Sequence, residues 1–478
     1  MGSSGPAGRL LAVNVPSAAA GSSRLAASAG RPHRAAGKPV PAPRPGLVRA
    51  ALAVVGVGLG ATAALAFTAE NGAQLRAPGG LATFAGSLTG LVGTYLALIM
   101  VLLVSRVPFV EHVLGLDGLL RWHRRLAVWP VSLLVAHALF ITVGYAQAAR
   151  SGLLRQVAAL LRSYPDVLSA TVGLALMCLA AVISIRAVRS RLRRETWWTV
   201  HLVMYLALAL SFLHVIVLGP SFVGHPLTQG IWTALWLATA GLVLGYRVLL
   251  PVLRSCRHQL RVAEVRAEGP RVVSVICTGR RLDRLAVSGG QFFCWRFLAP
   301  GLWWQAHPYS LSALPRPPFL RLTVKSAGDH SAALARLRPG TRVMIEGPYG
   351  VFTRHVRHRR RVLLIAAGIG VTALRALLED LPPAAHPVVL LRASSERDLV
   401  LRRELRDLVR HQHGRLHELV GPRETAGLDE WSLPRLVPDL DRRDVYVCGP
   451  AGFVAGIARL AAELGVPDEA IHHEAFAL

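Results

Sequence analysis

Residues 121–137 read RWHRRLAVWPVSLLVAH, and the rest of the chain is best interpreted from this stretch. His123 and His137 stand near the two ends of a segment that is apolar enough to lie in a membrane. Polar side chains inside a bilayer are costly and usually functional. A second pair, His201 and His214, stands in the later apolar segment TVHLVMYLALALSFLHV. The sequence therefore places four imidazoles in two apolar segments.

The composition favours a membrane protein. The chain of 478 residues is 53% hydrophobic and carries 54 Lys and Arg against 27 Asp and Glu, a net charge of +27. Such a charge is typical of proteins that bind nucleic acid or a membrane surface. The arginines cluster in loops between apolar runs, which favours membrane lipid as the partner and argues against nucleic acid. The five cysteines form no CxxC pair, so we expect no disulfide framework, zinc site or iron–sulfur cluster.

Six apolar runs approach the length that a helix needs to cross a bilayer. They lie near residues 48–67, 84–104, 124–146, 167–188, 197–218 and 230–250. The loops after the second and the fourth runs are rich in arginine, which predicts that these loops are cytoplasmic. We therefore expect a multi-pass protein of the cell membrane with both termini in the cytoplasm. Residues 1–46, rich in Ala, Gly, Ser, Pro and Arg, are expected to form a disordered cytoplasmic tail.

The pattern of apolar and polar residues changes after residue 250. Short segments such as LRVAEVRA and RVVSVICTG alternate apolar and polar residues, the pattern of a small antiparallel barrel or sandwich. From about residue 362, strand-like and helix-like runs alternate, which predicts a parallel sheet covered by helices. We expect a six-helix transmembrane bundle over 47–250, a β-barrel over 251–358 and an α/β nucleotide-binding domain over 359–478.

The two histidine-bearing runs are both expected to cross from the cytoplasm to the exterior, so each level of the bundle would hold two imidazoles. Such a pair can ligate one porphyrin iron, and fourteen residues of helix rise about 21 Å, enough to stack two haems. At about 100° per residue, thirteen residues separate His201 and His214 in azimuth. The fifth span would then need a local irregularity, or the haems would lie at different angles. The alternative is that the histidines are isolated polar residues that bond neighbouring helices.

The four histidines, with spacings of 14 and 13 residues, resemble the ferric reductase and NADPH oxidase superfamily. The resemblance extends from about residue 47 to the C-terminus. It implies two haem b groups in the six-helix domain and a flavin-reductase module in the cytoplasm. The implied metal ligands are His123, His137, His201 and His214.

The motifs after residue 300 agree with this resemblance in order and spacing. HPYSLSA at 307–313 resembles the flavin-binding segment of the family, and VKSAGDHSAAL at 324–334 and GPYG at 347–350 follow it. The resemblance implies FAD as a cofactor. The implied FAD-binding residues are His307, Pro308, Tyr309, Ser310, Lys325, Gly328, Ser331, Gly347 and Gly350.

AAGIGVTAL at 366–374 follows a strand-like run and opens a helix-like one. Its two glycines would let the backbone approach a pyrophosphate at a helix N-terminus, although an ordinary strand-to-helix turn is the alternative. Arginines follow the next strand where NAD-selective sites usually place an acid, so we expect NADPH rather than NADH. The resemblance implies nucleotide contacts from Gly368, Gly370, Thr372, Arg392, Ser394, Arg397, Gly449 and Pro450. It also implies two catalytic residues, Cys448 near the hydride path and Phe476 as the aromatic that covers the flavin.

These features together predict a transmembrane oxidoreductase that moves electrons from cytosolic NAD(P)H through FAD and two haems to an acceptor outside the cell. A ferric chelate or a periplasmic protein is favoured over O2, because Ile141 stands where the oxidases commonly carry another histidine. Three alternatives stay open: an NADPH oxidase that makes superoxide, a haem-free flavin reductase with a membrane anchor, and a transport or sensor protein with a regulatory nucleotide-binding module. The basic run at 354–361 is expected to be either a solvated face or a contact with anionic headgroups.

Overall fold

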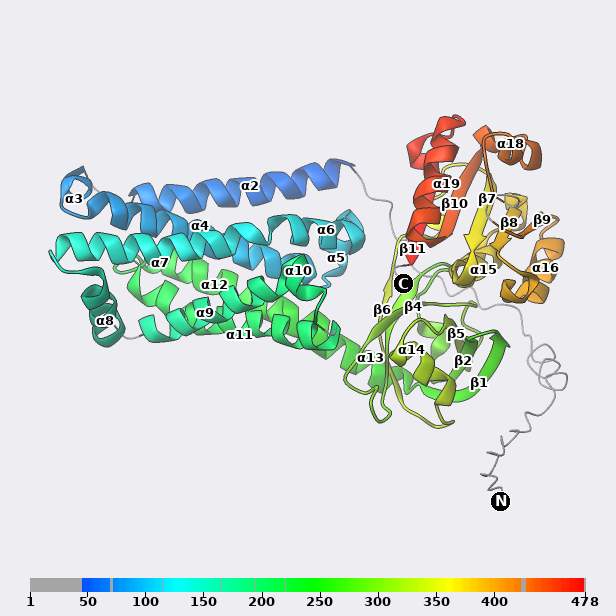
Figure 1. Cartoon of the computed structure of the whole chain (residues 1–478), viewed down its shortest axis with the longest axis horizontal. Coiled ribbons are helices and arrows are strands. Elements are labelled where there is room, and N and C mark those ends of the chain that lie inside the picture. Colours follow the sequence, from blue (N-terminus) through cyan, green and yellow to red (C-terminus); the bar gives the residue numbers. More distant parts are fainter. Residues whose placement is uncertain are drawn as a thin grey trace, which may run out of the picture.

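A computed structural model describes residues 45–476 except 69–71, 115, 165, 193, 220 and 423–426. A long bundle of helices is joined at one end to a two-lobed globular module (Figure 1). Residues 1–44, most of the expected disordered tail, lie outside the described residues.

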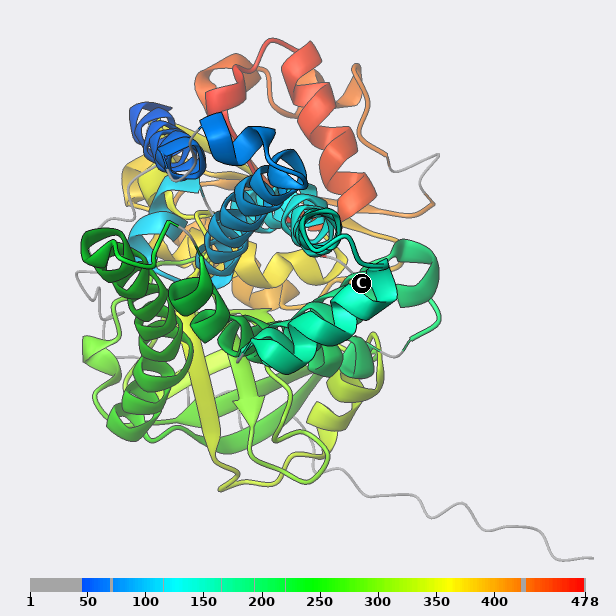
Figure 2. The same ribbon diagram turned by 90° about the vertical axis from the view of Figure 1, so that its left-hand side faces the viewer.

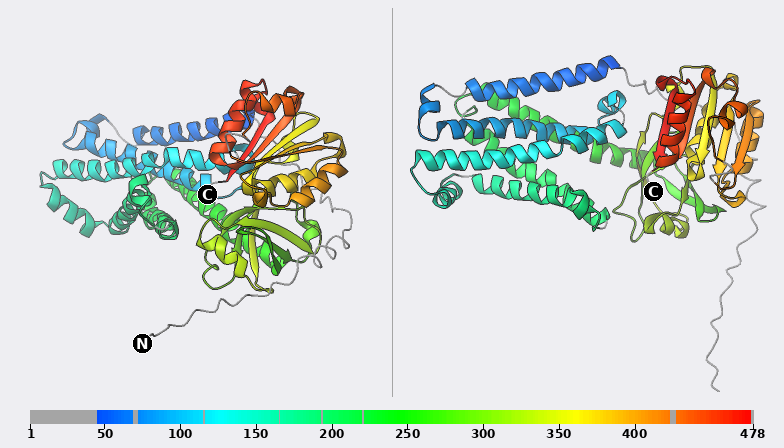
Figure 3. Two further views of the ribbon diagram at one scale, coloured as in Figure 1. Left: turned by 45° about the vertical axis from the view of Figure 1, so that its right-hand side comes forward. Right: turned by 45° about the horizontal axis from the view of Figure 1, so that its top comes forward.

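Six described helical stretches are long and apolar enough to cross a membrane. They are Gly46–Thr68, Gly80–Val104, Gly118–Ala148, Val167–Ser184, Thr196–Leu218 and Pro226–His258. They are helical because a bilayer offers backbone groups no partners outside the segment itself. They run alongside one another in views from two further directions (Figure 3), so the predicted six-helix bundle is confirmed.

The helices of the bundle are α2 (Pro45–Thr68), α4 (Gly80–Val104), α6 (Leu116–Leu126), α7 (Val128–Ala148), α9 (Val167–Ser184), α11 (Arg194–Leu218) and α12 (Pro226–Val243). Shorter helices connect them: α3 (Gly72–Arg76), α5 (Pro108–Leu114), α8 (Leu153–Ser163) and α10 (Arg186–Arg189). The helices α3 and α8 lie at the end of the bundle remote from the globular module, the end that faces the viewer in Figure 2.

The third membrane span is broken, and the fifth is not. The helices α6 and α7 are separated by a one-residue turn at Ala127. Pro130 lacks an N–H and cannot donate to the carbonyl of Leu126, which interrupts the helical hydrogen bonds at this point. The helix α11 is continuous from Arg194 to Leu218. An irregularity in the fifth span, one of the two possibilities raised by the histidine spacing, is therefore wrong.

The sixth span continues beyond the bundle into the globular module. After α12 the chain forms a π-helical segment, η1 (Leu244–Leu249), and then α13 (Leu250–His258), which packs against strand β6 (Val343–Tyr349). Pro251 cannot donate to the carbonyl of Arg247, which accounts for the wider turn between the two helices. This extension ties the membrane domain to the barrel.

The first lobe is an antiparallel barrel of two three-stranded sheets, in the orders β1-β2-β5 and β4-β3-β6. Its elements are β1 (Arg261–Gly269), β2 (Val272–Thr278), β3 (Phe292–Phe297), β4 (His307–Ser310), β5 (Phe319–Lys325), α14 (Asp329–Ala333) and β6. Strand β3, FFCWRF, alternates as the sequence predicts: Phe293, Trp295 and Phe297 are fully buried in the barrel core. Cys294 consequently points outward from the barrel.

The second lobe is a five-stranded parallel sheet in the order β11-β10-β7-β8-β9, with helices on its faces. Its strands are β7 (Arg361–Ala367), β8 (Val388–Ala393), β9 (Arg415–Val420), β10 (Arg443–Pro450) and β11 (Ile471–Phe476). Its helices are α15 (Val371–Asp380), α16 (Arg402–His411), α18 (Ser432–Leu436) and α19 (Ala451–Glu463). The central strands are almost wholly apolar because a separate core cluster covers each face. The predicted α/β architecture is confirmed.

A buried network of charges joins the two lobes. Arg375 on α15 is hydrogen-bonded to Glu379 on the same helix and to Glu404 on α16, the latter at 2.9 Å. From the barrel, Arg321 donates to both oxygens of Glu404 at 2.7 and 2.8 Å, and Arg316 donates to Glu379. Burial would raise the pKa of Glu404, but the hydrogen bonds from Arg321 and the charge of Arg375 lower it to about 2. The two lobes are therefore held in one relative orientation.

Replacing Arg375 tests this network. In Arg375→Met the buried Glu379 and Glu404 lose a shared cation, which costs about 3–5 kcal/mol for a buried ion pair. We expect the globular module of the detergent-solubilised full-length protein to become protease-sensitive at a temperature about 10 °C lower. Arg410→Met, on the exposed face of α16, is the matched control and should leave the transition unchanged. Equal transitions in the two variants would contradict the structural role of the network.

Candidate functional site

The structure brings together the histidines that the sequence singled out, in two pairs. The ring centres of His123 on α6 and His201 on α11 lie 6.2 Å apart, and we call these residues the proximal pair because they are nearer the globular module. The ring centres of His137 on α7 and His214 on α11 lie 6.1 Å apart and form the distal pair. One unbroken helix, α11, therefore contributes one histidine to each level.

Both separations suit an iron held between two imidazoles. A metal–imidazole bond is about 2 Å long and the ring centre lies about 1 Å behind the nitrogen, so two rings on opposite sides of one iron have centres about 6 Å apart. The ring planes cross at 77° in the proximal pair and at 66° in the distal pair. Such crossing is compatible with axial ligation, because each ring can rotate about its own bond to the metal.

The remaining ring nitrogens have the partners that metal-bound histidines usually have. Nδ1 of His137 lies 2.7 Å from the carbonyl oxygen of Gly86, and Nδ1 of His123 lies 3.2 Å from that of Met100. A histidine that donates one N–H to a carbonyl presents its other nitrogen as a metal ligand. Both bonds therefore leave Nε2 as the ligating atom.

The two histidines of α11 have different surroundings. Nδ1 of His201 lies 3.3 Å from the hydroxyl oxygen of Ser184, and the ring of Trp197 stacks on His201 with centres 5.2 Å apart. Trp197 also donates to Ser184 at 3.2 Å, which fixes this arrangement. Nδ1 of His214 is buried without a partner among the described residues. The orientation of His214 consequently depends on packing alone.

Glycines on α4 let its backbone approach the distal pair. A Cβ at Gly90 would lie 2.5 Å from Nδ1 of His137, and one at Gly86 would lie 2.7 Å from Ile141. A Cβ at Gly93 would lie 3.1 Å from Leu133 and Leu134. Small residues at helical spacing allow two membrane helices to pack closely. These glycines were not predicted as site residues, although their spacing along one helix face was the available signal.

No three of the His, Cys, Asp and Glu side chains within the described ranges gather as a metal held by protein groups alone would require. A porphyrin iron needs only two, because the macrocycle supplies its other four nitrogens. The histidine pairs thus fit a haem.

The end of the bundle beyond the distal pair is basic. Arg76, Arg150, Arg155 and Arg162 are all exposed there. A hollow of about 520 Å³ opens between α3, the start of α4 and the end of α7, and Arg76 and Gln147 are among the residues that line it. Beside His137, the side chain of Ile141 fills the next turn of α7 and packs against Gly86 of α4.

Two of the flavin motifs meet in the barrel. The HPYS segment forms β4, which pairs with β3. The His307 ring stacks on His330, with centres 3.7 Å apart, and the hydroxyl of Tyr309 lies 3.2 Å from Nδ1 of His330. His330 was not predicted as a site residue, although it lies within the quoted 324–334 segment. Pro308 is exposed, whereas Ser310, on the same face of the strand, is buried.

Ser331, Gly347 and Gly350 were also expected to bind FAD, and they lie in or beside turns of the barrel. The Ser331 hydroxyl accepts the N–H groups of Ala327 and Gly328 at 2.8 and 3.0 Å and closes the turn before α14. Lys325, at the end of β5, is exposed. Gly347 and Gly350 have positive φ values of 137° and 95°, which favour glycine.

The nucleotide motif forms the turn between β7 and α15. Gly368 has a φ of 55°, and a Cβ at Gly370 would lie 2.3 Å from the Cys448 carbonyl oxygen. Thr372 donates to the Ile369 carbonyl at 2.9 Å. Glycine is required at 370 because the loop lies directly against the end of β10. The loop and the N-terminus of α15 would suit a pyrophosphate.

The end of β10 and the last strand meet beside this loop. Pro450 is in register with Phe476 in the parallel β10–β11 pair, and Gly449 precedes it with a φ of 157°. The Cys448 side chain is fully buried in a core cluster, and burial raises its pKa well above the ordinary value. The thiol is therefore protonated and lies inside the core. Strand β11 ends on the side of the globular module that faces the bundle (Figures 1 and 3).

Arg392, Ser394 and Arg397, the residues expected to contact the adenosine part of the nucleotide, differ in their accessibility. Arg392 donates to the backbone carbonyls of Ala393 and Gly421, so its guanidinium holds the ends of β8 and β9 together. Ser394 and Arg397 are exposed beyond β8. Of the two arginines, Arg397 is the one whose side chain is accessible to a nucleotide.

Two arginines of the basic run at 354–361 pair with acids of the second lobe. Arg354 pairs with Asp380, and Arg361 pairs with Asp439 at 2.6 Å. The backbone N–H group of His358 donates to Asp444 at 3.1 Å. The run thus anchors the connection between the barrel and the sheet, while His358, Arg360 and Arg361 are exposed, as expected of a solvated face.

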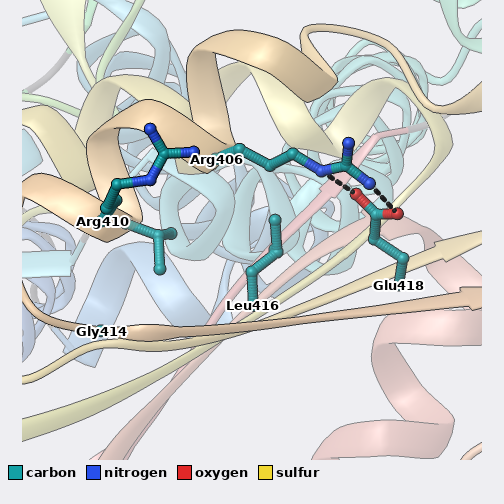
Figure 4. A pocket seen from close by; sticks show the side chains of 6 residues that line it. Arg406, Arg410, Gly414, Leu416 and Glu418 are labelled. Carbon is teal, nitrogen blue, oxygen red and sulfur yellow. Dashed lines mark hydrogen bonds and ion pairs between the residues drawn. The ribbon is translucent and has the colours of Figure 1, made fainter.

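A separate hollow of about 370 Å³ lies at the free edge of the sheet, between α16 and β9 (Figure 4). Arg406 lines it and donates to the two oxygens of Glu418 at 3.0 and 2.8 Å. Strand β9 is two strands away from β7, which leads into the glycine loop. This hollow is therefore distinct from the region where the cofactor motifs meet.

Two family models match the chain. The model described as the ferric reductase like transmembrane component matches residues 89–212, which include three of the four paired histidines. The model described as an FAD-binding domain matches residues 258–353, which include the HPYS and GPYG segments. The chain belongs to the ferric reductase and NADPH oxidase superfamily. It is a multi-pass membrane protein with an FAD-binding domain and a nicotinamide-nucleotide domain.

Curated relatives match the globular module of this superfamily member. Ferredoxin–NADP reductase B of Sorangium cellulosum is 34% identical over 190 residues, 35% of this chain and 77% of that protein. A flavohemoprotein of Deinococcus radiodurans is 28% identical over 213 residues, 40% of this chain and 52% of that protein. The chain thus spans about half the length of that flavohemoprotein. Among solved structures, the FAD/NAD binding domain of the Vibrio cholerae nitric oxide dioxygenase is 22% identical, with a TM-score of 0.39, and the match covers 46% of this chain and 98% of that one.

Gly90→Ala tests the fit of the distal pair. The new Cβ would lie 2.5 Å from Nδ1 of His137, so the ring must move, and the bond that it would make to a haem iron would weaken. We expect about half of the haem to lose its low-spin six-coordinate spectrum, measured by absorbance and electron paramagnetic resonance. Gly56→Ala, on α2 with open space around the new Cβ, is the control. Identical spectra in the wild type and both variants would refute the role assigned to this contact.

Proposed function

We propose that this protein transfers electrons from cytosolic NAD(P)H across the membrane to an acceptor on the outer face, with FAD and two haem b groups as carriers. The observation that carries the proposal is the presence of two histidine pairs, 6.2 and 6.1 Å between ring centres, in a bundle fused to a flavin-reductase module. A bound flavin exchanges two electrons with a nicotinamide as hydride and single electrons with a haem, which is why all three groups are needed.

The protein's own residues have separate tasks in this scheme. His123 and His201 would ligate the iron nearer the flavin, and His137 and His214 the iron nearer the outer face. The Met100 and Gly86 carbonyls orient the ligating rings, as their hydrogen bonds to Nδ1 indicate. Thirteen residues of α11 rise about 20 Å between the two levels, which suits two carriers in series. The barrel and the glycine loop of the sheet would bind FAD and the nucleotide.

Histidine replacement is the direct test of the haem assignment. We expect about two haems per wild-type chain and about half as much in His214→Ala, because one of two irons loses an axial ligand. Full haem content in His214→Ala would contradict the assignment. His225→Ala, an exposed loop histidine, controls for the loss of a histidine as such.

Anaerobic NADPH should then reduce both haems in the wild type and leave the distal haem oxidised in His201→Ala. A wild-type protein without a Soret band would instead indicate a haem-free flavin reductase. Haem that NADPH does not reduce would favour a transport or sensor protein.

The structure supports NADPH as the preferred donor. NAD-selective sites usually offer an acid to the ribose 2′-hydroxyl, whereas arginine accommodates a 2′-phosphate. The acid nearest to the end of β8, Glu396, is paired with Arg402 at 3.3 Å. Ser394 and Arg397 are exposed beside it. The expectation from the sequence therefore rests on Arg397 rather than on Arg392.

Arg397→Ala should lower kcat/KM for NADPH by about tenfold and leave NADH unaffected, since one charge-assisted contact to phosphate is worth about 1.5–3 kcal/mol. Steady-state kinetics with both nucleotides is the measurement. Arg403→Ala, an exposed arginine on α16, is the charge-matched control. A wild-type enzyme that prefers NADH would overturn the assignment.

A ferric chelate or a partner protein is the favoured acceptor. An enzyme dedicated to superoxide production benefits from a polar group that stabilises the new anion. Here Ile141 fills the turn beyond His137. The four exposed arginines at this end of the bundle would attract an anionic chelate.

Sealed, oriented proteoliposomes supplied with NADPH distinguish the acceptors. We expect reduction of an external ferric chelate to continue in the presence of superoxide dismutase. Superoxide formed in stoichiometric amounts, with no dismutase-resistant ferric reduction, would make the protein an oxidase.

A further inference from the structure

Glu346, on β6 of the barrel, is shared by two segments of the membrane domain. Its Oε1 accepts the Tyr349 hydroxyl at 2.6 Å. Nε of Arg106 lies 3.9 Å from the same oxygen, and Nη1 of Arg247 lies 3.7 Å from it. Arg106 stands between α4 and α5, and Arg247 stands in the π-helical segment of the sixth span. One carboxylate thus joins two points of the bundle to the barrel.

Arg106 makes a second contact with the same barrel segment. Its guanidinium carbon lies 4.5 Å from the centre of the Tyr349 ring. Its φ of 64° is unusual for a residue other than glycine and persists only where surrounding contacts hold it. A third arginine, Arg254 on α13, donates to the Gly347 carbonyl. All three arginines therefore reach the segment Glu346–Gly350, which contains GPYG.

The junction is shielded from solvent. The side chains of Arg106 and Glu346 are only 16% and 18% exposed, so their attraction is stronger than that of a surface pair. Cys294, which points outward from β3, lies among the same charges, and burial raises its pKa to about 11. Glu111 on α5 is the second acid near Arg106, and burial raises its pKa to about 7. The thiol of Cys294 is a natural reporter of this junction.

The junction is also connected to the proximal pair. Arg106 follows the end of α4 by two residues, and Met100 on α4 orients His123 through its carbonyl. The connection runs from His123 through α4 to Arg106, and from there to the GPYG turn of the barrel. A shift of Glu346 would therefore move the barrel, which is expected to bind FAD, relative to the proximal pair.

We infer that Glu346 is a positioning residue that docks the barrel beneath the proximal pair by holding Arg106 and Arg247 against the GPYG turn. The inference rests on the proposed function, since it assigns FAD to the barrel and haem to the proximal pair. Electron transfer between cofactors falls steeply with distance. Loss of docking should consequently slow haem reduction while hydride transfer to the flavin, which takes place within the globular module, continues.

Glu346→Gln, in the full-length protein with its cofactors, tests this role in stopped-flow mixing with NADPH. The flavin should be reduced at the wild-type rate, whereas haem reduction should slow by about tenfold or more, as small displacements of reacting groups commonly do. Glu264→Gln is the matched control, because Glu264 pairs with Arg266 on the exposed side of β1. It should leave both rates unchanged.

Alkylation of the native cysteines, followed by mass spectrometry, gives a reading that needs no haem. In Glu346→Gln, Cys294 should react about tenfold faster than in the wild type, because an exposed thiol recovers its ordinary thiolate fraction. Cys256 on α13 is exposed and reports reagent access. Cys277 is fully buried in the barrel core and should stay protected if the barrel remains folded.

Unchanged Cys294 alkylation together with unchanged haem reduction would overturn the inference. If Cys277 becomes reactive in Glu346→Gln, the barrel itself has unfolded, and Arg247→Gln, which alters the junction from the membrane side, becomes the deciding variant with the same two expected results. Failure of the proposed function would look different. The wild type would then lack NADPH-reducible haem, while the Cys294 result would still report whether Glu346 docks the barrel.

Discussion

The separation of the paired histidine rings, 6.2 and 6.1 Å, is the constraint on which the architecture of the bundle depends. One continuous helix, α11, supplies a histidine to each level, so its partners must adapt to it. The partner span differs from it in that its helix is interrupted at Ala127, between the two histidines that it contributes. Glycines on α4 then allow its backbone to reach the distal pair closely. In a bilayer, where helices gain nothing from excluding water, such close packing is what holds them together.

The globular module and its attachment to the bundle are held by different kinds of contact. Within the module, Arg321, Arg375, Glu379 and Glu404 form a buried network that fixes the two lobes relative to each other. The attachment to the bundle relies on arginines converging on Glu346 and its neighbours, together with the helical extension of the sixth span. Arg106 and Arg247 lie 3.9 and 3.7 Å from Glu346, whereas Arg321 and Arg375 lie only 2.7–2.9 Å from Glu404, so the pairs at the junction separate more easily. The module is therefore the more rigid unit, and its docking is the step that a small change can alter.

Much of the fold was predictable because it follows from periodicity. Six apolar runs of bilayer length can only be helices, and the alternating and continuous apolar runs after residue 250 distinguish the barrel from the parallel sheet. The candidate site was less predictable where a side chain's partner lies far away in the sequence. From its position in the sequence, Arg392 is expected to bind a phosphate, but in the structure it donates to the Ala393 and Gly421 carbonyls. The basic run at 354–361 resembles a free surface until Asp380, Asp439 and Asp444 are found beside it.

The sequence by itself determined which groups the chain offers: four imidazoles in apolar segments, glycine-rich turns, and arginines at the ends of strands and helices. These features depend on residue type and spacing along one element, so they can be read without the fold. Only the tertiary structure decided which groups meet. The irregularity lies in the third span rather than the fifth, and His330 stacks on His307. Cys448 is buried in the core, and Arg106 and Arg247 both approach Glu346. Each of these results is a long-range contact that depends on how separate elements pack, and spacing within one element carries no information about packing.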